Sequence, residues 1–187
     1  IGDGRSEPLA LVTPTSAGAP LVAVDALRGG VGSAVSYAPR GMSQPVLFGC
    51  VGGFLGAGKT TALVAAAREI QARRLSVGVV ANDQGRDLVD TAVFRDVGLP
   101  TAEVAGGCFC CRFHELLSGA DRLLAAHPVD VLLAEAVGSC TDLVATVYRP
   151  LHRFFPDRFR LAPLTVFVEP DRVGAMCRAG GPIPPDL

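Results

Sequence analysis

The stretch GGFLGAGKTT, from Gly52 to Thr61, is the most informative part of this sequence. Gly53, Gly58, Lys59 and Thr60 have the G-x-x-x-x-G-K-[ST] spacing of a phosphate-binding loop. Glycines let backbone N–H groups turn toward phosphate oxygens, Lys59 brings a positive charge to the β- and γ-phosphates, and Thr60 offers a hydroxyl to Mg²⁺. The alternative is a Gly-rich turn with a solvated lysine. Because an apolar run precedes the motif and an Ala-rich segment follows it, the sequence predicts that the chain binds a nucleoside phosphate.

Strand and helix patterns alternate around this loop. Four apolar runs typical of buried strands lie at residues 45–51, 76–82, 129–135 and 163–169. Four segments with a helical pattern lie at residues 59–75, 87–97, 113–127 and 141–151. This alternation predicts an α/β fold of three layers, in which a mostly parallel sheet carries helices on both faces.

The balance of charges and the lengths of the apolar runs limit the kinds of partner that we expect for this chain. The chain has 187 residues, of which 49% are hydrophobic, and its 17 Lys and Arg nearly balance its 18 Asp and Glu. A chain without a basic excess gives no electrostatic reason to expect nucleic acid or an anionic membrane as partner. No uninterrupted apolar run is long enough to cross a bilayer. Residues 1–44 are rich in Gly, Ala, Pro and Ser, so we interpret them as a flexible leader to a domain at 45–187.

Two further segments are candidates for the nucleotide site. Glu135 ends the apolar run 129–135, where an acidic residue can help to hold Mg²⁺, and Gly138 follows closely enough to approach a γ-phosphate. An ordinary acid at the end of a strand is the alternative interpretation. The polar stretch NDQG, with Asn82, Asp83 and Gln84, is either a switch segment that orders on the γ-phosphate or simply a loop.

Three of the six cysteines lie within four positions, at Cys108, Cys110 and Cys111. Thiolates are soft ligands that suit Zn²⁺ and related transition metals, and three of them leave a fourth position open for exchange of the metal. The nearest candidates for a fourth ligand are Glu103, Asp83 and His114. Two alternatives are that the thiols serve as small buried side chains or form a reversible disulfide.

The remaining cysteines give a weaker signal. Cys50 and Cys177 are explained as small hydrophobic residues, and core packing is the preferred interpretation for Cys140, although it follows the Glu135 strand closely. Adjacent thiols are typical of ligands rather than of a disulfide framework. We therefore expect the protein in a reducing cytoplasm.

The phosphate loop, the C-x-C-C cluster and the E-x-x-G strand end together resemble the CobW-like family of GTP-dependent metallochaperones. The resemblance covers about residues 45–187 and rests on "GFLGAGKTT" at 53–61, "NDQG" at 82–85 and "GCFCC" at 107–111. It implies a P-loop NTPase fold, GTP and Mg²⁺ as nucleotide and cofactor, and Zn²⁺, Co²⁺, Ni²⁺ or Fe²⁺ as cargo. It also implies that Cys108, Cys110 and Cys111 hold the cargo metal.

The site residues follow from the motif and the resemblance together. We assign catalysis to Lys59, Glu135 and Asp83, and the Mg²⁺ ion to Thr60 and Glu135. The residues assigned to nucleotide binding are Gly53, Gly56, Ala57, Gly58, Lys59, Thr60, Thr61 and Gly138.

The chain also departs from the family pattern. "EAVGSCTDL" differs from the common E-T-T-G-x-A-D-P, and no N-K-x-D guanine motif occurs. That motif would fall beyond Leu187, so we expect a GTPase domain that is incomplete on its C-terminal side, lacks the family's C-terminal domain, and has weak activity alone. The metal, the oligomeric state and the role of residues 1–44 stay open.

The leading hypothesis is therefore a GTP-hydrolysing metallochaperone that delivers its metal to a client metalloprotein, with a homodimer as one assembly. A binding module without turnover, either a zinc sensor or a thiol redox switch, is the main alternative. A small-molecule kinase also shares the phosphate loop, but it leaves the cysteine cluster unexplained.

Overall fold

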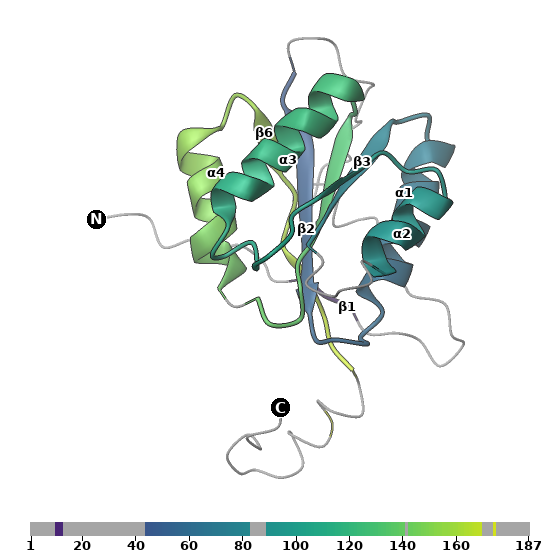
Figure 1. Cartoon of the computed structure of the whole chain (residues 1–187), viewed down its shortest axis with the longest axis vertical. Coiled ribbons are helices and arrows are strands. Elements are labelled where there is room, and N and C mark those ends of the chain that lie inside the picture. The colour runs from purple at the N-terminus through teal and green to yellow at the C-terminus, as the bar shows by residue number, and fades with distance from the viewer. Residues whose placement is uncertain (1–9, 13–43, 83–88, 141, 170–173, 175–187) are drawn as a thin grey trace.

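The computed structural model describes residues 10–12, 44–82, 89–140, 142–169 and 174 (Figure 1). Asp83, Gln84 and Gly85 of the predicted switch segment, and Cys177, lie outside these residues. The strands are β1 (Ala10–Val12), β2 (Val46–Gly53), β3 (Val77–Ala81), β4 (Thr101–Glu103), β5 (Val131–Glu135), β6 (Phe159–Leu161) and β7 (Thr165–Phe167). The helices are α1 (Lys59–Ala72), α2 (Val89–Asp96), α3 (Phe113–Ala126), the π-helix η2 (Val144–Tyr148) and α4 (Arg149–Phe154).

The strands form one sheet in the order β1-β7-β2-β5-β3-β4, and β6 also pairs with β2. Every strand pairing that the structure describes is parallel. The strands β2, β3 and β5 are buried along almost their whole length, as expected for parallel strands that are covered on both faces. The predicted parallel α/β fold is confirmed.

Helices cover both faces of the sheet, so the molecule has three layers (Figure 1). On one face, apolar side chains of α1 and α2 such as Leu63, Ile70 and Phe94 pack against the odd-numbered residues of β3 and β5. On the other face, α3, η2 and α4 supply Leu116, Val147 and Leu151 to a second core cluster. The period-2 alternation of the strands separates these two clusters, as it must in a sheet with two buried faces.

The strand that follows α4 is interrupted. Val46–Phe48 pairs with β6, Val51–Gly53 pairs with β7, and the residues from Ala162 to Leu164 between them carry Pro163. Proline has no N–H to donate, which suits a break in a ladder. The buried N–H of Cys50 lies at this break and donates instead to the hydroxyl of Tyr148, at 2.9 Å. The hydroxyl of Tyr148 thus accepts the hydrogen bond that a carbonyl of the neighbouring strand would otherwise accept.

Several details differ from the sequence predictions. The short strands β4 and β6 were not predicted, because three residues are too few to show a period. The helix predicted at 141–151 is a π-helix followed by α4. Within the predicted leader, residues 10–12 form β1 beside β7, and the domain division at residue 44 stays a prediction. In the part of the chain that the structure describes, no helix is long and apolar enough to cross a membrane.

Candidate functional site

The candidate residues gather at one edge of the sheet. In a parallel sheet the carboxyl ends of all strands lie at the same edge, which is where α/β proteins bind ligands. The phosphate-binding loop follows β2, Asn82 follows β3, and Glu135 ends β5. The thiol loop, which we define as residues 104–112, follows β4 at the same edge and leads into α3. The topology therefore brings the nucleotide motif and the cysteines together.

The phosphate-binding loop is built from β2 into α1. The side chain of Lys59 is only 6% exposed, and its ammonium Nζ donates to the carbonyl of Phe54 at 3.0 Å, across the loop. Helix α1 has no side-chain N-cap and no acidic residue in its first turn. Its first N–H groups and the lysine charge therefore face the loop interior without a competing anion from the helix, as phosphate binding requires.

Glycines hold this loop in conformations that other residues rarely adopt. Gly53, Gly56 and Gly58 have positive φ angles of 127°, 79° and 87°. At Gly53 a Cβ would lie 2.1 Å from the carbonyl oxygen of Phe167, so only glycine fits there. At Gly56 and Gly58 a Cβ would meet no atom within 4 Å. Gly53 is therefore needed for close packing against β7, whereas Gly56 and Gly58 are needed for the positive φ angles of the loop.

Thr60 and Glu135 meet across the site. The Thr60 hydroxyl donates to Oε1 of Glu135 at 2.8 Å, although 75 positions separate the two residues in the chain. Glu135 is 2% exposed at the end of β5, and Thr60 lies in the first turn of α1. The carboxylate of Glu135 and the hydroxyl of Thr60 are the two oxygen groups that the sequence predicts as ligands of Mg²⁺. The structure brings them together, and their role as ligands stays a prediction.

Gly138 packs directly on the phosphate-binding loop. A Cβ at this position would lie 2.8 Å from the backbone nitrogen of Leu55. Two residues earlier, the N–H of Ala136 donates to the carbonyl of Val51 at 2.9 Å. The segment after β5 is thus fitted against the phosphate-binding loop without room for a side chain at residue 138.

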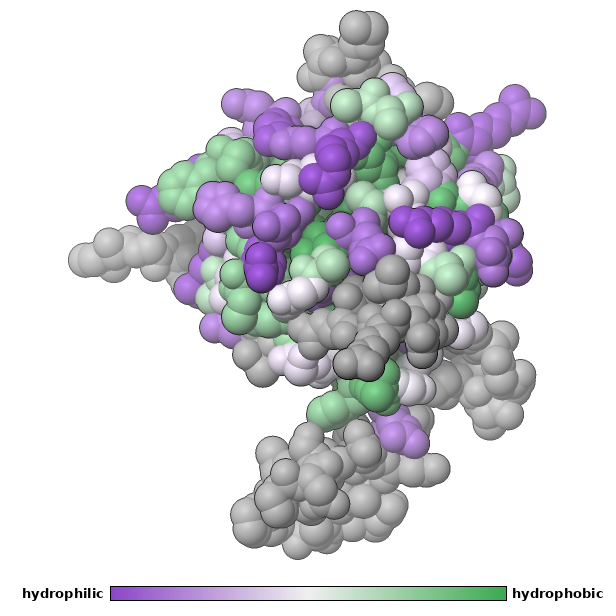
Figure 2. Space-filling model, in the orientation of Figure 1, coloured by the Kyte–Doolittle hydropathy of each residue, from purple (hydrophilic) through white to green (hydrophobic). Residues whose placement is uncertain are grey.

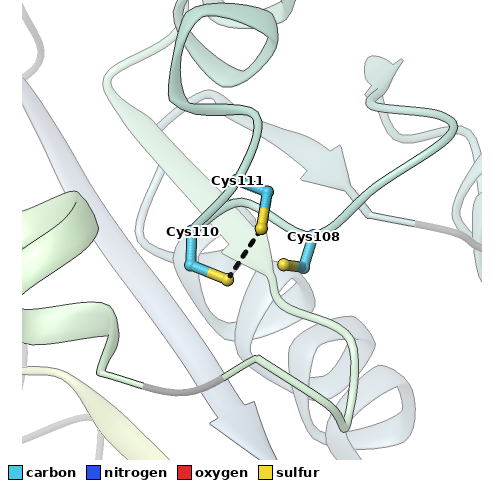
Figure 3. Close-up of side chains that lie close together, drawn as sticks. All are labelled: Cys108, Cys110 and Cys111. Atoms are coloured by element: carbon cyan, nitrogen blue, oxygen red, sulfur yellow. Dashed lines mark hydrogen bonds between the residues drawn. The ribbon is translucent and has the colours of Figure 1, made fainter.

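The three clustered thiols converge (Figure 3). The sulfur atoms of Cys108, Cys110 and Cys111 all lie within 4.8 Å of one another, and those of Cys110 and Cys111 are 3.9 Å apart. Zn–S bonds of about 2.3 Å would place two sulfurs of a tetrahedral site about 3.8 Å apart. The N–H groups of Cys111 and Arg112 both donate to the carbonyl of Cys108, and this tight turn is what brings the sulfurs together. The geometry suits a transition-metal ion.

The thiols of the cluster differ in acidity. Hydrogen bonding, first from Cys110, lowers the pKa of Cys108 to about 7. Interactions with Cys108, and then with Cys110, raise the pKa of Cys111 to about 11. Burial raises the pKa of Cys50 in β2. Cys108 therefore forms a thiolate at a lower pH than Cys111 or Cys50 does.

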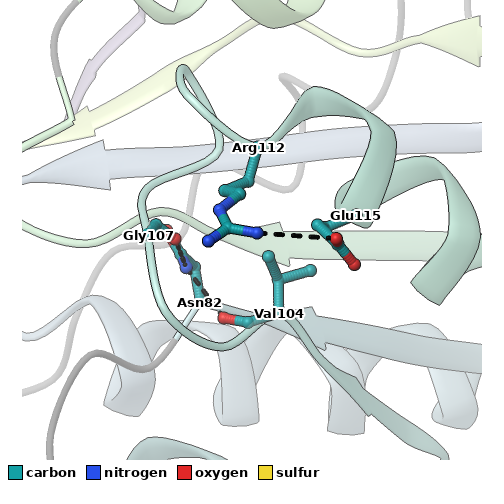
Figure 4. A network of polar contacts seen from close by, with 5 residues as sticks. All are labelled: Asn82, Val104, Gly107, Arg112 and Glu115. Atoms are coloured by element: carbon teal, nitrogen blue, oxygen red, sulfur yellow. Dashed lines mark hydrogen bonds and ion pairs between the residues drawn. The ribbon is translucent and has the colours of Figure 1, made fainter.

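Asn82 fastens the thiol loop to the sheet (Figure 4). Its side chain, 3% exposed, donates to the carbonyls of Val104 and Gly107 at 2.9 and 2.7 Å and accepts from the N–H of Phe109 at 3.1 Å. Its own backbone N–H donates to the carbonyl of Glu135 at 3.0 Å. Asn82 also belongs to the predicted switch segment, and that role stays a prediction because Asp83, Gln84 and Gly85 lie outside the described residues. No local pattern in the sequence indicates the contacts that its side chain makes with the thiol loop.

Among the residues that the structure describes, the predicted fourth ligands Glu103 and His114 do not join the cluster, and Asp83 lies outside these residues. Glu103 lies 4.0 Å from Arg95, and His114 is exposed with its ring against Phe113. Cys50 is buried in the core, as predicted. Cys140 packs against the core, which agrees with the preferred interpretation. Burial, partly offset by the backbone of Cys110 and Phe109, raises the pKa of Cys140 to about 12.

The family follows from a comparison of the whole chain with known protein families. The model of the CobW/HypB/UreG nucleotide-binding domain matches residues 47–173, which include the phosphate-binding loop, the thiol loop and Glu135. The chain belongs to this family. The predicted resemblance is confirmed, and the CobW-family domain described here is a nucleotide-binding domain with a cysteine cluster that can bind a metal.

Individual relatives share smaller parts of this CobW-family chain. A tetraacyldisaccharide 4'-kinase of Verminephrobacter eiseniae (strain EF01-2) is 40% identical in a 95-residue alignment that covers 43% of this chain and 22% of the kinase. The chain thus spans about a fifth of that curated relative. The signal recognition particle receptor FtsY of Elizabethkingia anophelis in complex with GDP is 18% identical, with a TM-score of 0.48 over 65% of this chain and 41% of the receptor. A second structure of that receptor is 20% identical, with a TM-score of 0.47 over 62% of this chain and 40% of the receptor.

Proposed function

We propose that this CobW-family domain binds and hydrolyses GTP and uses the nucleotide to control a transition-metal ion held by Cys108, Cys110 and Cys111. One observation carries the proposal: the thiol loop and the phosphate-binding loop lie at the same sheet edge, and Asn82 and Glu135 join them. A metal site placed independently of the nucleotide site would need no such connection. The metal is cargo in this proposal, and a client metalloprotein in the cytoplasm receives it.

The residues at the sheet edge fit a Mg²⁺-nucleotide. Lys59 would exchange its contact with the carbonyl of Phe54 for the β- and γ-phosphate oxygens, and the N–H groups of the loop would hold the same phosphates. The oxygens of Thr60 and Glu135 would hold Mg²⁺, which neutralises the charge on the phosphates when it is bound. The guanine preference rests on the family, since the base pocket is not among these residues.

The cluster fits a cargo site better than a structural one. Structural zinc sites are closed by four protein ligands, whereas three sulfurs on a partly exposed turn leave a position that a client's ligand can enter. Cys111 is exposed and Cys108 and Cys110 are half-buried, so the sulfurs can be reached from solvent. Zn²⁺, Co²⁺ and Ni²⁺ all accept such a set of ligands.

A substitution of Lys59 tests the proposal. In Lys59→Ala, GTP binding and hydrolysis should be lost while Co²⁺ binding without nucleotide is retained, because the ammonium group of the lysine contacts the phosphate-binding loop at the carbonyl of Phe54. The matched control is Arg68→Ala, which removes a cation from an exposed position of the same helix and should leave both properties unchanged. GTP turnover by Lys59→Ala at the wild-type rate would refute the proposed role of the loop.

A thiol redox switch is the second candidate, and the lowered pKa of Cys108 favours it. A thiolate near neutral pH attacks oxidants more readily than a thiol, and Cys110 is a neighbouring partner for a disulfide. Mild peroxide treatment followed by mass spectrometry distinguishes the two. A rapid loss of two hydrogens within residues 108–111 even with Zn²⁺ present would favour the switch, whereas protection by Zn²⁺ would favour metal handling.

A small-molecule kinase is ranked below both candidates. The similarity to the tetraacyldisaccharide 4'-kinase covers only 22% of that protein. The thiol cluster has no role in transfer of a phosphoryl group to a small acceptor, and a buried asparagine that holds a cysteine loop would have no purpose there.

A further inference from the structure

Phe109 is the buried residue of the thiol cluster. Within residues 105–112, all of which the structure describes, it alone is buried, and its side chain is 0% exposed. Its neighbours in the chain, Cys108 and Cys110, are half-buried, and Cys111 is exposed. The loop thus places one large apolar side chain in the protein interior, between two of the cysteines.

This burial is not a matter of hydrophobicity alone. Apolar side chains also lie on the surface of this protein, as they do in most proteins. Figure 2 shows apolar residues among polar ones on the visible face, and Phe154 is 65% exposed. The complete burial of a phenylalanine on an otherwise accessible loop therefore requires contacts that hold it there.

Two kinds of contact fix the chain at Phe109. Its N–H donates to Oδ1 of the buried Asn82 at 3.1 Å. Its side chain belongs to the apolar core cluster that also contains Val104 at the start of the loop, Leu116 of α3 and Ala136 after β5. The hydrogen bond and the apolar packing act on the same residue, so the structure around the loop sets the position of Phe109.

The position of Phe109 in turn limits where the cysteines can lie. The N–H groups of Cys111 and Arg112 donate to the carbonyl of Cys108 at 3.0 and 2.9 Å, and Phe109 lies within the turn that these bonds close. The three sulfur atoms of this turn lie within 4.8 Å of one another. An ion that meets ligands already held together does not have to order the loop, and ordering a loop on binding lowers the affinity.

We propose that Phe109 is a positioning residue of the metal site, which holds the turn between Cys108 and Cys110 so that the three sulfurs converge before an ion binds. The inference rests on the proposed metal site and adds a residue that acts on it without contacting the ion. The affinity of the exposed thiols then depends on packing in the core beneath them.

The test is an anaerobic Co²⁺ titration of the reduced protein, compared with the variant Phe109→Ala. Sulfur-to-cobalt charge-transfer absorption reports both the affinity and the number of thiolates on each bound ion. The Co²⁺ affinity of the variant should fall by about 10- to 100-fold, the range found for residues that hold metal ligands in place. The absorption at saturation should match that of the wild type, because all three thiols are retained.

A second buried phenylalanine provides the matched control. Phe94 on α2 is also 0% exposed, but it belongs to the core cluster on the other face of the sheet. Phe94→Ala leaves a cavity of the same kind away from the thiol loop, so its Co²⁺ affinity should equal that of the wild type. Phe109→Leu should restore most of the affinity, because an apolar side chain of similar size again fills the core.

Circular dichroism checks that the variants fold. If Phe109→Ala does not fold, Phe109→Val leaves a smaller cavity, and the same comparison is made with Phe94→Val. Wild-type Co²⁺ affinity in the folded Phe109 variant, or an equal loss in the matching Phe94 variant, would overturn the positioning role and leave the three-sulfur site standing. The absence of thiolate bands in the wild type itself would overturn the metal site, and the positioning role with it.

Discussion

Asn82 shows how one side chain can organise a binding site. Its amide makes three hydrogen bonds to the backbone of the thiol loop from a buried position at the end of β3. An amide is required there, because it must donate twice and accept once. No ionised or purely apolar side chain of similar size can do the same.

We therefore expect Asn82→Asp to loosen the thiol loop. The carboxylate would face the carbonyls of Val104 and Gly107 with no hydrogen to donate, at a cost of about 1 to 3 kcal/mol for each buried group left unsatisfied. Urea unfolding should show the lower stability, and zinc affinity should fall. The matched control is Gln71→Glu, the same change of amide to carboxylate at an exposed position on α1. Equal stability of the two variants would show that Asn82 does not clamp the loop.

The lowered pKa of Cys108 leads to a second prediction about a single residue. Its pKa is lowered to about 7 from the usual 9.0, chiefly by hydrogen bonding from Cys110. Because the pKa of an acid is lowered, the thiolate forms as the pH rises through 7, and about half of it is present at pH 7. Alkylation of metal-free protein, read by peptide mass spectrometry, should therefore modify Cys108 with a midpoint near pH 7.

The neighbouring thiols provide the comparison. Cys111, with a pKa raised to about 11, should react last, and only in alkaline solution. In Cys110→Ala the midpoint for Cys108 should move toward higher pH, because its main hydrogen-bonding partner is gone. A single profile near pH 9 for both Cys108 and Cys111 would contradict the proposed interaction between the thiols.

At the scale of the elements, the turn after β5 packs directly against the phosphate-binding loop. Replacing Gly138 with alanine would place a Cβ 2.8 Å from the backbone nitrogen of Leu55, where a backbone has to move. We expect Gly138→Ala to weaken nucleotide binding while the metal-free thiols keep their reactivity. Titration calorimetry with GTP, with Ser139→Ala as control, measures the effect. Unchanged affinity would mean that this turn does not shape the nucleotide site.

The elements also show what a sequence can predict. The buried strands β2, β3 and β5 and the helices α1 and α3 have strong patterns and lie close to their predicted bounds. The three-residue strands β4 and β6 have no readable pattern, since their pairing with β3 and β2 defines them. The π-helix η2 depends on packing in the same way, because a helical period does not reveal its hydrogen bonds.

The parts of the site that lie within a short stretch of sequence were predictable. The phosphate-binding loop and the three thiols are contiguous motifs, so their spacing indicated them. The contact between Thr60 and Glu135 could be anticipated only from the role of an acid at a strand end. The contacts of Asn82 with the thiol loop depend on which strands are neighbours, and the order β5-β3-β4 cannot be derived from the chain alone.

At the scale of the whole molecule, the parallel sheet places the phosphate-binding loop and the proposed metal site at one edge and joins them through β3 and β5. Coupling between two sites is a free energy, and it is reciprocal: a nucleotide that changes the metal affinity must have its own affinity changed by the same factor. We therefore predict that binding of the nucleotide and binding of the metal change each other's affinity, although the two ligands are chemically unrelated.

Zinc affinity in three nucleotide states is the measurement that tests this claim most directly. It uses competition with a chromogenic chelator, on reduced protein without nucleotide, with Mg²⁺-GDP and with a Mg²⁺-bound non-hydrolysable GTP analogue. We expect the zinc affinities in the GDP and GTP states to differ by roughly 5- to 150-fold, and zinc to change the affinity for the analogue by a matching factor relative to GDP. Equal zinc affinity in all three states would contradict it.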